Sequence, residues 1–280
     1  MSLYQEFDHL RIPLEDIKRA TNNFAEENLI VNRDYGKVYK GELVRSEGLI
    51  MCAFKRVNRS FGHGYRDFMN EIGMLLKYRH DNIVSLVGFC NESDDQILVS
   101  EFLANGSLDQ YLGSPKLTWS MRLEICLGVA RGLTNLHCYV DPLDLDTGFL
   151  TKESDIHSFG VVLFEVLCGR LACTYEEDII QFLSQVACHH YEKGTLSDII
   201  DPILKKQMNP KSLSSFSAIA YDCLQGNRKE RPTILEITKK LEQALALQHE
   251  FDKALLVEQL LLNTSPEPAD FAVSNSTGRS

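Results

Sequence analysis

The chain has 280 residues, of which 44% are hydrophobic and 24% charged, a composition typical of a folded soluble protein with a substantial core. Its formal net charge of −10 argues against a surface for nucleic acid or an anionic membrane, because both are themselves negatively charged. The eight cysteines form neither a C-x-x-C pair nor a dense framework, which favours free or buried thiols in a reducing compartment.

No stretch of the sequence predicts insertion into a membrane. Residues 1–10 are polar and of mixed charge, unlike a secretory signal. The most apolar helix-length stretch, residues 156–168, contains Glu165 and is too short to span a bilayer. Ser2 follows Met1, so we expect no N-myristoylation signal. We therefore expect a cytoplasmic protein.

The first part of the chain alternates short apolar runs with turns, which predicts a β-rich lobe. Residues 12–24 predict a short helix followed by a turn. Strands are expected within residues 29–57, and a helix over residues 68–78, where apolar side chains recur at helical spacing. The last predicted elements of this lobe are strands at residues 83–90 and 96–102, with a polar turn at residues 91–95.

The chain after Asn105-Gly106-Ser107 follows a helical pattern throughout. Residues 156–167 are apolar nearly all round, which predicts a helix buried in the middle of a second lobe. The other predicted helices cover residues 117–137, 179–187, 212–223 and 234–247. Residues 263–280 are rich in Ser, Pro, Asn and Thr, a composition typical of disorder.

Short motifs follow one another in a fixed order along the chain. They are Ala20-Thr21-Asn22-Asn23-Phe24, Tyr35-Gly36-Lys37-Val38-Tyr39-Lys40-Gly41, Ala53-Phe54-Lys55, Asn70-Glu71-Ile72, Arg79-His80-Asp81-Asn82-Ile83-Val84, Ile97-Leu98-Val99-Ser100-Glu101-Phe102, Ser154-Asp155-Ile156-His157-Ser158-Phe159-Gly160-Val161-Val162 and Arg231-Pro232-Thr233. In this order they resemble the protein kinase superfamily, and in particular the plant receptor-like Ser/Thr kinases, from about Phe7 to Leu247. The resemblance is broken by one large gap.

The resemblance implies an α+β, two-lobed protein kinase-like fold. The small lobe would be an antiparallel sheet with one helix, and the large lobe would be truncated and mainly helical. The implied division is a juxtamembrane-like segment at 1–28, a kinase-like small lobe at 29–104, a truncated large lobe at 105–250, and the end of a C-terminal helix with a disordered tail at 251–280.

The resemblance also implies which residues would line a nucleotide cleft. Lys55 would bind the nucleotide phosphates, and Glu71 would orient Lys55. The backbone from Glu101 to Leu103 would hold the adenine, and Ser100 would guard the pocket behind it. The implied cofactor-binding positions are Lys55, Glu71, Gly36, Val38, Ala53, Glu101 and Leu103.

The phosphate-binding loop departs from the family pattern. Aligned on Gly36, the first and second glycines of that pattern fall on Val31 and Arg33. A side chain at these positions obstructs the close approach of backbone to phosphate, or demands an unfavourable backbone conformation. Arg33 could offer its charge to a phosphate, but Val31 is an ordinary strand residue. The sequence therefore predicts a β-turn that no longer holds phosphate well.

The segment that performs phosphoryl transfer in the family is missing. Its catalytic loop, H-R-D, supplies an Asp that accepts the substrate proton and an Asn that holds Mg²⁺, and its D-F-G motif supplies a second metal-binding Asp. Both follow the helix that ends here at Leu136-His137, but neither motif occurs in this sequence. Only residues 138–140 separate His137 from Asp141-Pro142, which resembles the far end of the activation segment. We assign no catalytic residue and no metal ligand.

The gap predicts structural consequences. Arg231 would lose the Glu partner of the family, because Leu143 occupies that position, although Asp144 or Asp146 could reach it. An unpaired buried charge costs several kcal/mol. Asp155, which braces the catalytic loop in the family, is expected to act as a helix N-terminal residue beside Ser154.

The connection across the gap is short but long enough to close the lobe. Residues 138–150 span roughly 40 Å when extended, enough to bridge two packed helices. The missing strands are expected to uncover apolar surface beside residues 156–167, a feature of partner sites or of proteins that aggregate.

Three functional hypotheses remain. The first is a catalytically inactive pseudokinase that binds a protein partner, a receptor kinase or its substrate, at the inner face of the plasma membrane. ATP and Mg²⁺ are implied only by the resemblance, and weak or no binding is expected. The second is a Ser/Thr protein kinase whose catalytic segment is missing only from this sequence. The third is a poorly folded remnant without function.

Overall fold

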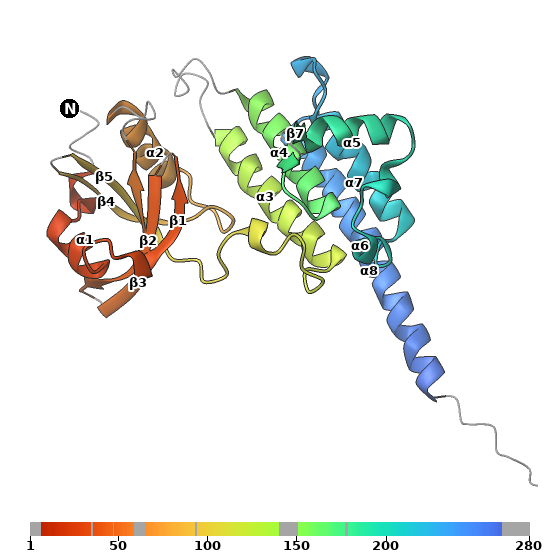
Figure 1. Cartoon of the computed structure of the whole chain (residues 1–280), viewed down its shortest axis with the longest axis horizontal. Helices are drawn as coiled ribbons and strands as arrows, with labels where there is room; N and C mark the ends of the chain where they lie inside the picture. The colour runs from red at the N-terminus through yellow and green to blue at the C-terminus, as the bar shows by residue number, and fades with distance from the viewer. Residues whose placement is uncertain are drawn as a thin grey trace, which may run out of the picture.

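The structure is a computed structural model that describes residues 7–34, 36–46, 48–58, 65–92, 94–139, 151–176 and 179–264. It has two lobes, one built on a sheet and one mainly helical, joined near residues 102–107 (Figure 1). The α+β, two-lobed kinase-like fold class is confirmed. The division into four segments stays a prediction.

The small lobe contains a five-stranded antiparallel sheet, within the described residues, of order β1-β2-β3-β5-β4. Its strands are β1 (Leu29–Arg33), β2 (Gly36–Arg45), β3 (Gly48–Val57), β4 (Leu86–Glu92) and β5 (Asp95–Glu101). More buried and less buried side chains alternate along much of β2 and β3, because successive side chains of a strand point to opposite faces of a sheet. The predicted turn at 91–95 is narrower than expected, since β4 runs to Glu92 and β5 begins at Asp95.

Each face of this sheet is covered by one helix. On one face lies α1 (Leu14–Ala20), whose buried Leu14 and Ile17 join a core with Phe54. On the other face lies α2 (Tyr65–Lys77), whose buried Phe68 and Ile72 pack with other apolar side chains of that face. The helix and turn predicted at residues 12–24 are confirmed. The turn holds three successive residues with positive φ, Asn22, Asn23 and Phe24.

The large lobe is a bundle around one core. Its helices are α3 (Trp119–Tyr139), α4 (Lys152–Cys168), α5 (Leu183–Glu192), α6 (Pro202–Lys205), α7 (Pro210–Cys223) and α8 (Ile234–Thr264). The α3 and α7 helices pack on α8, and α4 packs on α7. Trp119 of α3 is fully buried, where its indole N–H donates to Ser212 Oγ at 3.2 Å and its ring meets Phe216 edge-on. The predicted buried helix at 156–167 is confirmed, since α4 contributes eight buried residues.

Two predictions for the large lobe were wrong. The chain after residue 107 is not helical throughout, because β6 (Cys173–Glu176) and β7 (Ile179–Phe182) form a two-stranded antiparallel sheet. The helix expected at 179–187 therefore begins at Leu183. Apolar runs of four residues fit a strand and a buried helix equally well, so periodicity could not separate them.

The α8 helix is longer than the predicted 234–247. Its C-terminal end projects from the body of the large lobe (Figure 1) and carries exposed apolar side chains. These are Leu255, Leu256, Val257, Leu260 and Leu261. The tail predicted to be disordered lies outside the described residues from 265 onward.

The apolar surface expected beside α4 is not found on α4 itself. None of the described large apolar side chains of α4 is exposed, and Val161 and Val162 are half-buried. The eight cysteines are free thiols, five of them buried, as the spacing predicted. Burial raises the pKa of the Cys126 thiol to about 12, so this group is an inert part of the core.

Candidate functional site

The cleft side of the small lobe carries a Lys–Glu ion pair. Lys55 Nζ on β3 donates to Glu71 Oε1 on α2 at 2.8 Å, and both side chains are a little more than one-third exposed. The pair forms because α2 is anchored on this face of the sheet through Ile72, which is fully buried and directly follows Glu71. The two residues that the sequence assigned to one role are thus in contact.

Other predicted positions share this face of the sheet. Val38 lies opposite Lys55 in the β2–β3 register, and Ala53 lies opposite Ser100 in the β3–β5 register. Because side chains alternate between faces, Val38, Ala53 and Lys55 point to the same side. The sheet thus places a short apolar floor beside a cation, an arrangement that suits a flat, anionic ligand.

The segment between the lobes is held by its own hydrogen bonds. Glu101 donates its backbone N–H to Ser85 O at 3.1 Å, and its carboxylate accepts the Ser85 N–H at 2.7 Å. Leu103 O accepts the Gly106 N–H at 3.0 Å, and the Leu103 side chain is 57% exposed. These hydrogen bonds hold both ends of the segment between the lobes.

The phosphate-loop position holds a tight β-turn. Gly36 has φ +151°, and a Cβ there would lie 2.5 Å from Arg56 O on β3. Glycine is thus required at this position for the close approach of β2 to β3, whether or not a phosphate binds. Val31 and Arg33 continue the strand, opposite Val38 and Gly36. The pairing of Arg33 with Gly36 fits the predicted turn, and its weak hold on phosphate stays a prediction.

The structure adds a contact that the sequence did not predict at this turn. Arg33 Nη2 lies 3.8 Å from Asp109 Oδ2, which belongs to a short 3₁₀ helix, Leu108–Gln110, of the large lobe. No sequence pattern could have found this pair, because the two residues belong to different lobes.

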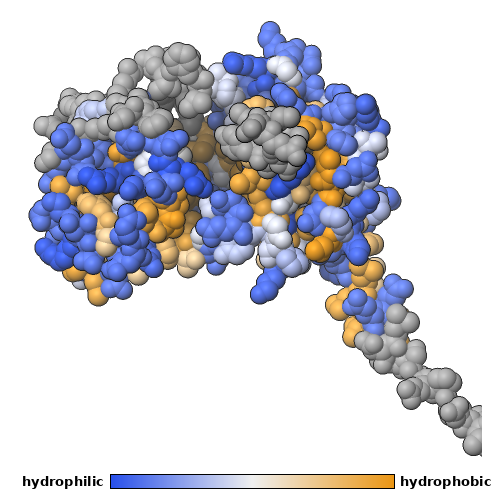
Figure 2. All heavy atoms as spheres, viewed as in Figure 1, coloured by the Kyte–Doolittle hydropathy of each residue, from blue (hydrophilic) through white to orange (hydrophobic). Residues whose placement is uncertain are grey.

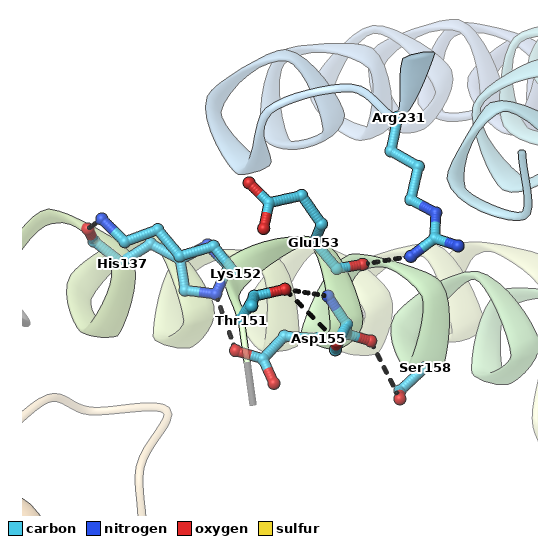
Figure 3. A network of polar contacts seen from close by, with 8 residues as sticks. His137, Thr151, Lys152, Glu153, Asp155, Ser158 and Arg231 are labelled. Atoms are coloured by element: carbon cyan, nitrogen blue, oxygen red, sulfur yellow. Dashed lines mark hydrogen bonds and ion pairs between the residues drawn. The ribbon is translucent and has the colours of Figure 1, made fainter. Parts of the chain in front are cut away.

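A second polar cluster marks the junction where the catalytic segment is missing. His137 Nε2 at the end of α3 lies 3.0 Å from Asp155 Oδ2 on α4, and only 9% of the His137 side chain is exposed (Figure 3). Lys152 Nζ donates to the His137 carbonyl, so a cation lies at the C-terminal end of α3, where the helix dipole favours positive charge. These contacts join α3 directly to α4.

The prediction for Asp155 is confirmed, since it lies in the first turn of α4, directly after Ser154. The helix N-cap is Thr151, whose hydroxyl accepts the Ser154 N–H at 3.3 Å. The sequence did not predict the contact between the Asp155 carboxylate and His137.

The loss of a carboxylate partner at Arg231 stays a prediction, although the described part of the chain offers this residue other hydrogen-bond partners. Its guanidinium donates to two carbonyls, Glu153 O at 2.7 Å and Gln225 O at 2.8 Å, and the residue is half-buried. The positive charge therefore keeps hydrogen-bond partners and partial hydration. Burial, together with the Arg231 charge, lowers the pKa of His157. The alternative partners Asp144 and Asp146 lie outside the described residues.

The residues fit only part of a Mg²⁺–nucleotide complex. The apolar floor and the Lys55–Glu71 pair suit the adenine and a phosphate, respectively. No group of three or more His, Cys, Asp or Glu residues that could hold a metal occurs within the described ranges. The two family motifs that supply metal-binding carboxylates are absent from the sequence. Metal binding therefore has no support among the described residues, and its weakness or absence stays a prediction.

The junction contacts lead to a testable prediction about stability. Replacing His137 or Asp155 by Ala is expected to lower the free energy of unfolding by about 1 kcal/mol each, because each leaves a partly buried partner unsatisfied. The double variant should cost less than the sum of the two, by about 0.5 kcal/mol or more, since the residues are in contact. Urea unfolding of all four proteins measures this coupling.

The matched control is Arg131 with Glu242, an ion pair at 3.0 Å in which both side chains are about half exposed. Their coupling should be at the lower end of the range for exposed pairs, about 0.2 kcal/mol. An equal coupling free energy in both pairs would show that the contact between His137 and Asp155 stabilises the fold no more than an exposed ion pair does.

No helix in the described part of the chain combines the length and the apolar content that crossing a bilayer demands.

Comparison with known proteins gives consistent matches. A family model described as protein tyrosine and serine/threonine kinase matches residues 26–140, so the match ends directly after α3. Three similar relatives come from Arabidopsis thaliana. Receptor-like protein kinase HERK 1 is 35% identical over 295 residues, covering 85% of this chain and 35% of the relative. Receptor-like protein kinase FERONIA is 34% identical, covering 83% and 32%. Probable receptor-like protein kinase At2g23200 is 36% identical, covering 85% and 35%.

These alignments have two further properties. The chain spans only about a third of the length of the curated relatives it matches. The alignment with HERK 1 runs over 295 residues, more than the 280 of this chain, although it covers 85% of the chain. HERK 1 therefore carries residues in the aligned region that have no counterpart here.

Proposed function

Since this chain belongs to the protein kinase superfamily, among the plant receptor-like kinases, we propose that it is a pseudokinase that binds a protein partner in receptor-kinase signalling. One observation carries the proposal. The helices on either side of the gap, α3 and α4, are in direct contact through His137 and Asp155. The sequence between these helices contains neither H-R-D nor D-F-G.

Phosphoryl transfer requires several groups in position at the same time. The Lys55–Glu71 pair supplies one of them. The proton acceptor and the two metal ligands of the family come from the floor of the large lobe, and this chain has no residues at those positions. No carboxylate of the small lobe can replace them, because the acceptor hydroxyl reacts at the opposite wall of the cleft. A cleft of this composition supports binding without transfer.

Nucleotide binding is proposed to be weak. The candidate positions are Lys55, Glu71, Gly36, Val38, Ala53, Glu101 and Leu103, and the relatives as protein kinases imply ATP and Mg²⁺ in general. Without metal ligands, most of the phosphate charge would be met by Lys55 alone. The concentration of a free ligand must exceed its Kd by about 100-fold to stabilise the native state by about 2.7 kcal/mol.

The corresponding experiment is a thermal shift with ATP, with and without Mg²⁺. We expect a shift below about 1 °C at millimolar nucleotide, and no increase when Mg²⁺ is added, because no described group holds the metal. Lys55→Ala should remove any shift that remains, whereas Arg131→Ala, in the large lobe away from the cleft, should leave it unchanged. A Mg²⁺-dependent shift that disappears in Lys55→Ala would contradict the proposal.

The proposed partner is a receptor kinase or its protein substrate, and the proposed location is the cytoplasm, at the inner face of the plasma membrane through that partner. The support is the family itself, since receptor-like relatives act on and with proteins. Titration calorimetry of the chain against the cytoplasmic kinase domains of FERONIA and HERK 1 tests this idea. The proposal would be contradicted if no heat of binding were measured with either domain or with any substrate protein of these kinases.

A second candidate is a Ser/Thr protein kinase whose catalytic segment is missing only from this sequence. Two observations favour it: the intact Lys55–Glu71 pair, and the residues of HERK 1 that have no counterpart here. The length of the transcript between the codons for His137 and Asp141 separates the two candidates. An additional in-frame segment that encodes H-R-D and D-F-G would establish the enzyme, and a transcript matching this sequence would exclude it.

A further inference from the structure

The two lobes touch at the back of the cleft through two glycines of α3. A Cβ at Gly128 would lie 3.0 Å from Asn82 Nδ2, and a Cβ at Gly132 would lie 3.1 Å from Asn82 O. Asn82 and Ile83 belong to the segment between α2 and β4 of the small lobe. The absence of side chains on α3 lets this segment approach the helix closely. We call this contact between α3 and the segment at Asn82 the pivot, because closely packed backbone there joins the two lobes.

The two lobes also meet through an ion pair between Arg33 and Asp109. Arg33 lies at the end of β1, the strand nearest the large lobe in Figure 1, and Asp109 lies in the first turn of the large lobe after the hinge. Their side chains are 58% and 35% exposed, and Arg33 Nη2 lies 3.8 Å from Asp109 Oδ2. The space-filling view in Figure 2 shows the molecule hollowed between the two lobes. The ion pair therefore joins the two lobes.

Asp109 has a further charged neighbour within the large lobe. Burial raises the pKa of Glu165, and the negative charge of Asp109 raises it further, so the two carboxyl groups are within electrostatic reach. Glu165 already accepts the Ala172 N–H at 2.6 Å. Arg33 forms an ion pair with Asp109, and it comes from the other lobe. Closure of the cleft thus brings the positive charge of Arg33 to the carboxylate of Asp109, which has a second acidic residue, Glu165, nearby.

We propose that Arg33 and Asp109 form a latch that holds the two lobes closed. A glycine at position 33 would have no side chain to span this distance, so the same substitution that disturbs the phosphate loop creates the latch. Closure about the pivot at Gly128 and Gly132 makes the ion pair, and opening breaks it. A ligand that enters the cleft would therefore enter while the two lobes are open. The latch does not depend on the proposed function, because it concerns lobe closure and not phosphate transfer.

The size of the effect follows from the exposure of the pair. Exposed ion pairs are weak and screened by salt, because water competes for both charges. Loss of the pair should lower the ratio of closed to open molecules by about 1.4- to 5-fold. A latch of this strength is reversible, and a strongly anionic partner that competes for Arg33 would open it.

Single-molecule energy transfer between the lobes tests the latch. Dyes are attached through non-natural amino acids at Lys40 on β2 and Lys239 on α8, both exposed, so that the native thiols are not used. In the parent chain we expect a mainly closed population at low salt that decreases as salt increases. Arg33→Ala and Asp109→Ala should each reduce the closed-to-open ratio by about 1.4- to 5-fold at low salt and remove its dependence on salt.

A charge exchange and a matched control complete the experiment. The double variant Arg33→Asp with Asp109→Arg should restore closure and its salt dependence, since the attraction is the same with the signs reversed. Arg131→Ala, which breaks an exposed pair within the large lobe, should leave the ratio unchanged. Single variants that keep the parent ratio, or a charge exchange that fails to restore it while thermal unfolding is unchanged, would overturn the proposal.

Discussion

The purified chain is expected to transfer no phosphate from Mg²⁺·ATP to a protein acceptor. Its signal should equal the background measured with its Lys55→Ala variant. A positioned proton acceptor contributes about 10²- to 10⁴-fold to such a reaction, and the metal ions stabilise the charge of the transferring group in addition. The chain lacks the motifs for both. The Lys55–Glu71 pair cannot compensate, because it orients a phosphate but accepts no proton from the attacking hydroxyl.

The converse experiment has the largest expected effect. Insertion of a segment that carries the H-R-D and D-F-G motifs of the family between α3 and α4 should produce activity at least about 10³-fold above the background of the parent chain. Adding Lys55→Ala to this chimera should remove the activity again. Radiolabelled ATP with a generic protein acceptor measures all four proteins. Transfer by the parent chain itself, sensitive to Lys55→Ala, would contradict the pseudokinase proposal.

The second large effect concerns the stability of the large lobe. Arg122 on α3 is only 1% exposed, and its guanidinium donates to three backbone carbonyls, Leu117 O at 3.0 Å, Val166 O at 2.9 Å and Leu112 O at 2.6 Å. Burial lowers the pKa of this group. Arg122→Met keeps much of the side-chain volume but leaves these carbonyls without their donor. We expect the free energy of unfolding to fall by about 3–5 kcal/mol.

Urea unfolding followed by circular dichroism measures this loss. Arg131→Ala on the same helix removes an exposed guanidinium and should change the free energy of unfolding by less than about 0.5 kcal/mol. A loss below about 1 kcal/mol in Arg122→Met would show that water replaces the guanidinium at the carbonyls, contrary to its burial in the folded chain.

Local patterns predicted most of the helices and strands correctly. The short apolar runs of the strands and the helical spacing along α2 and α3 are local features of the sequence, so they can be recognised without knowing the neighbouring elements. The same holds for Lys55 and Glu71, which the family motifs assigned to one role and the fold brings to 2.8 Å. The β6–β7 hairpin was missed because its strands are too short for periodicity to separate them from a helix.

The amino-acid sequence by itself therefore determined the two lobes, because they depend on local periodicity. It also determined the family and the absence of the catalytic motifs, because these depend on which residues are present. Only the tertiary structure decided how the loss is accommodated. His137 reaches Asp155, Arg231 reaches two carbonyls, and Arg33 reaches Asp109. These contacts join side chains far apart in sequence, and their partners depend on how helices and lobes pack, which no local pattern encodes.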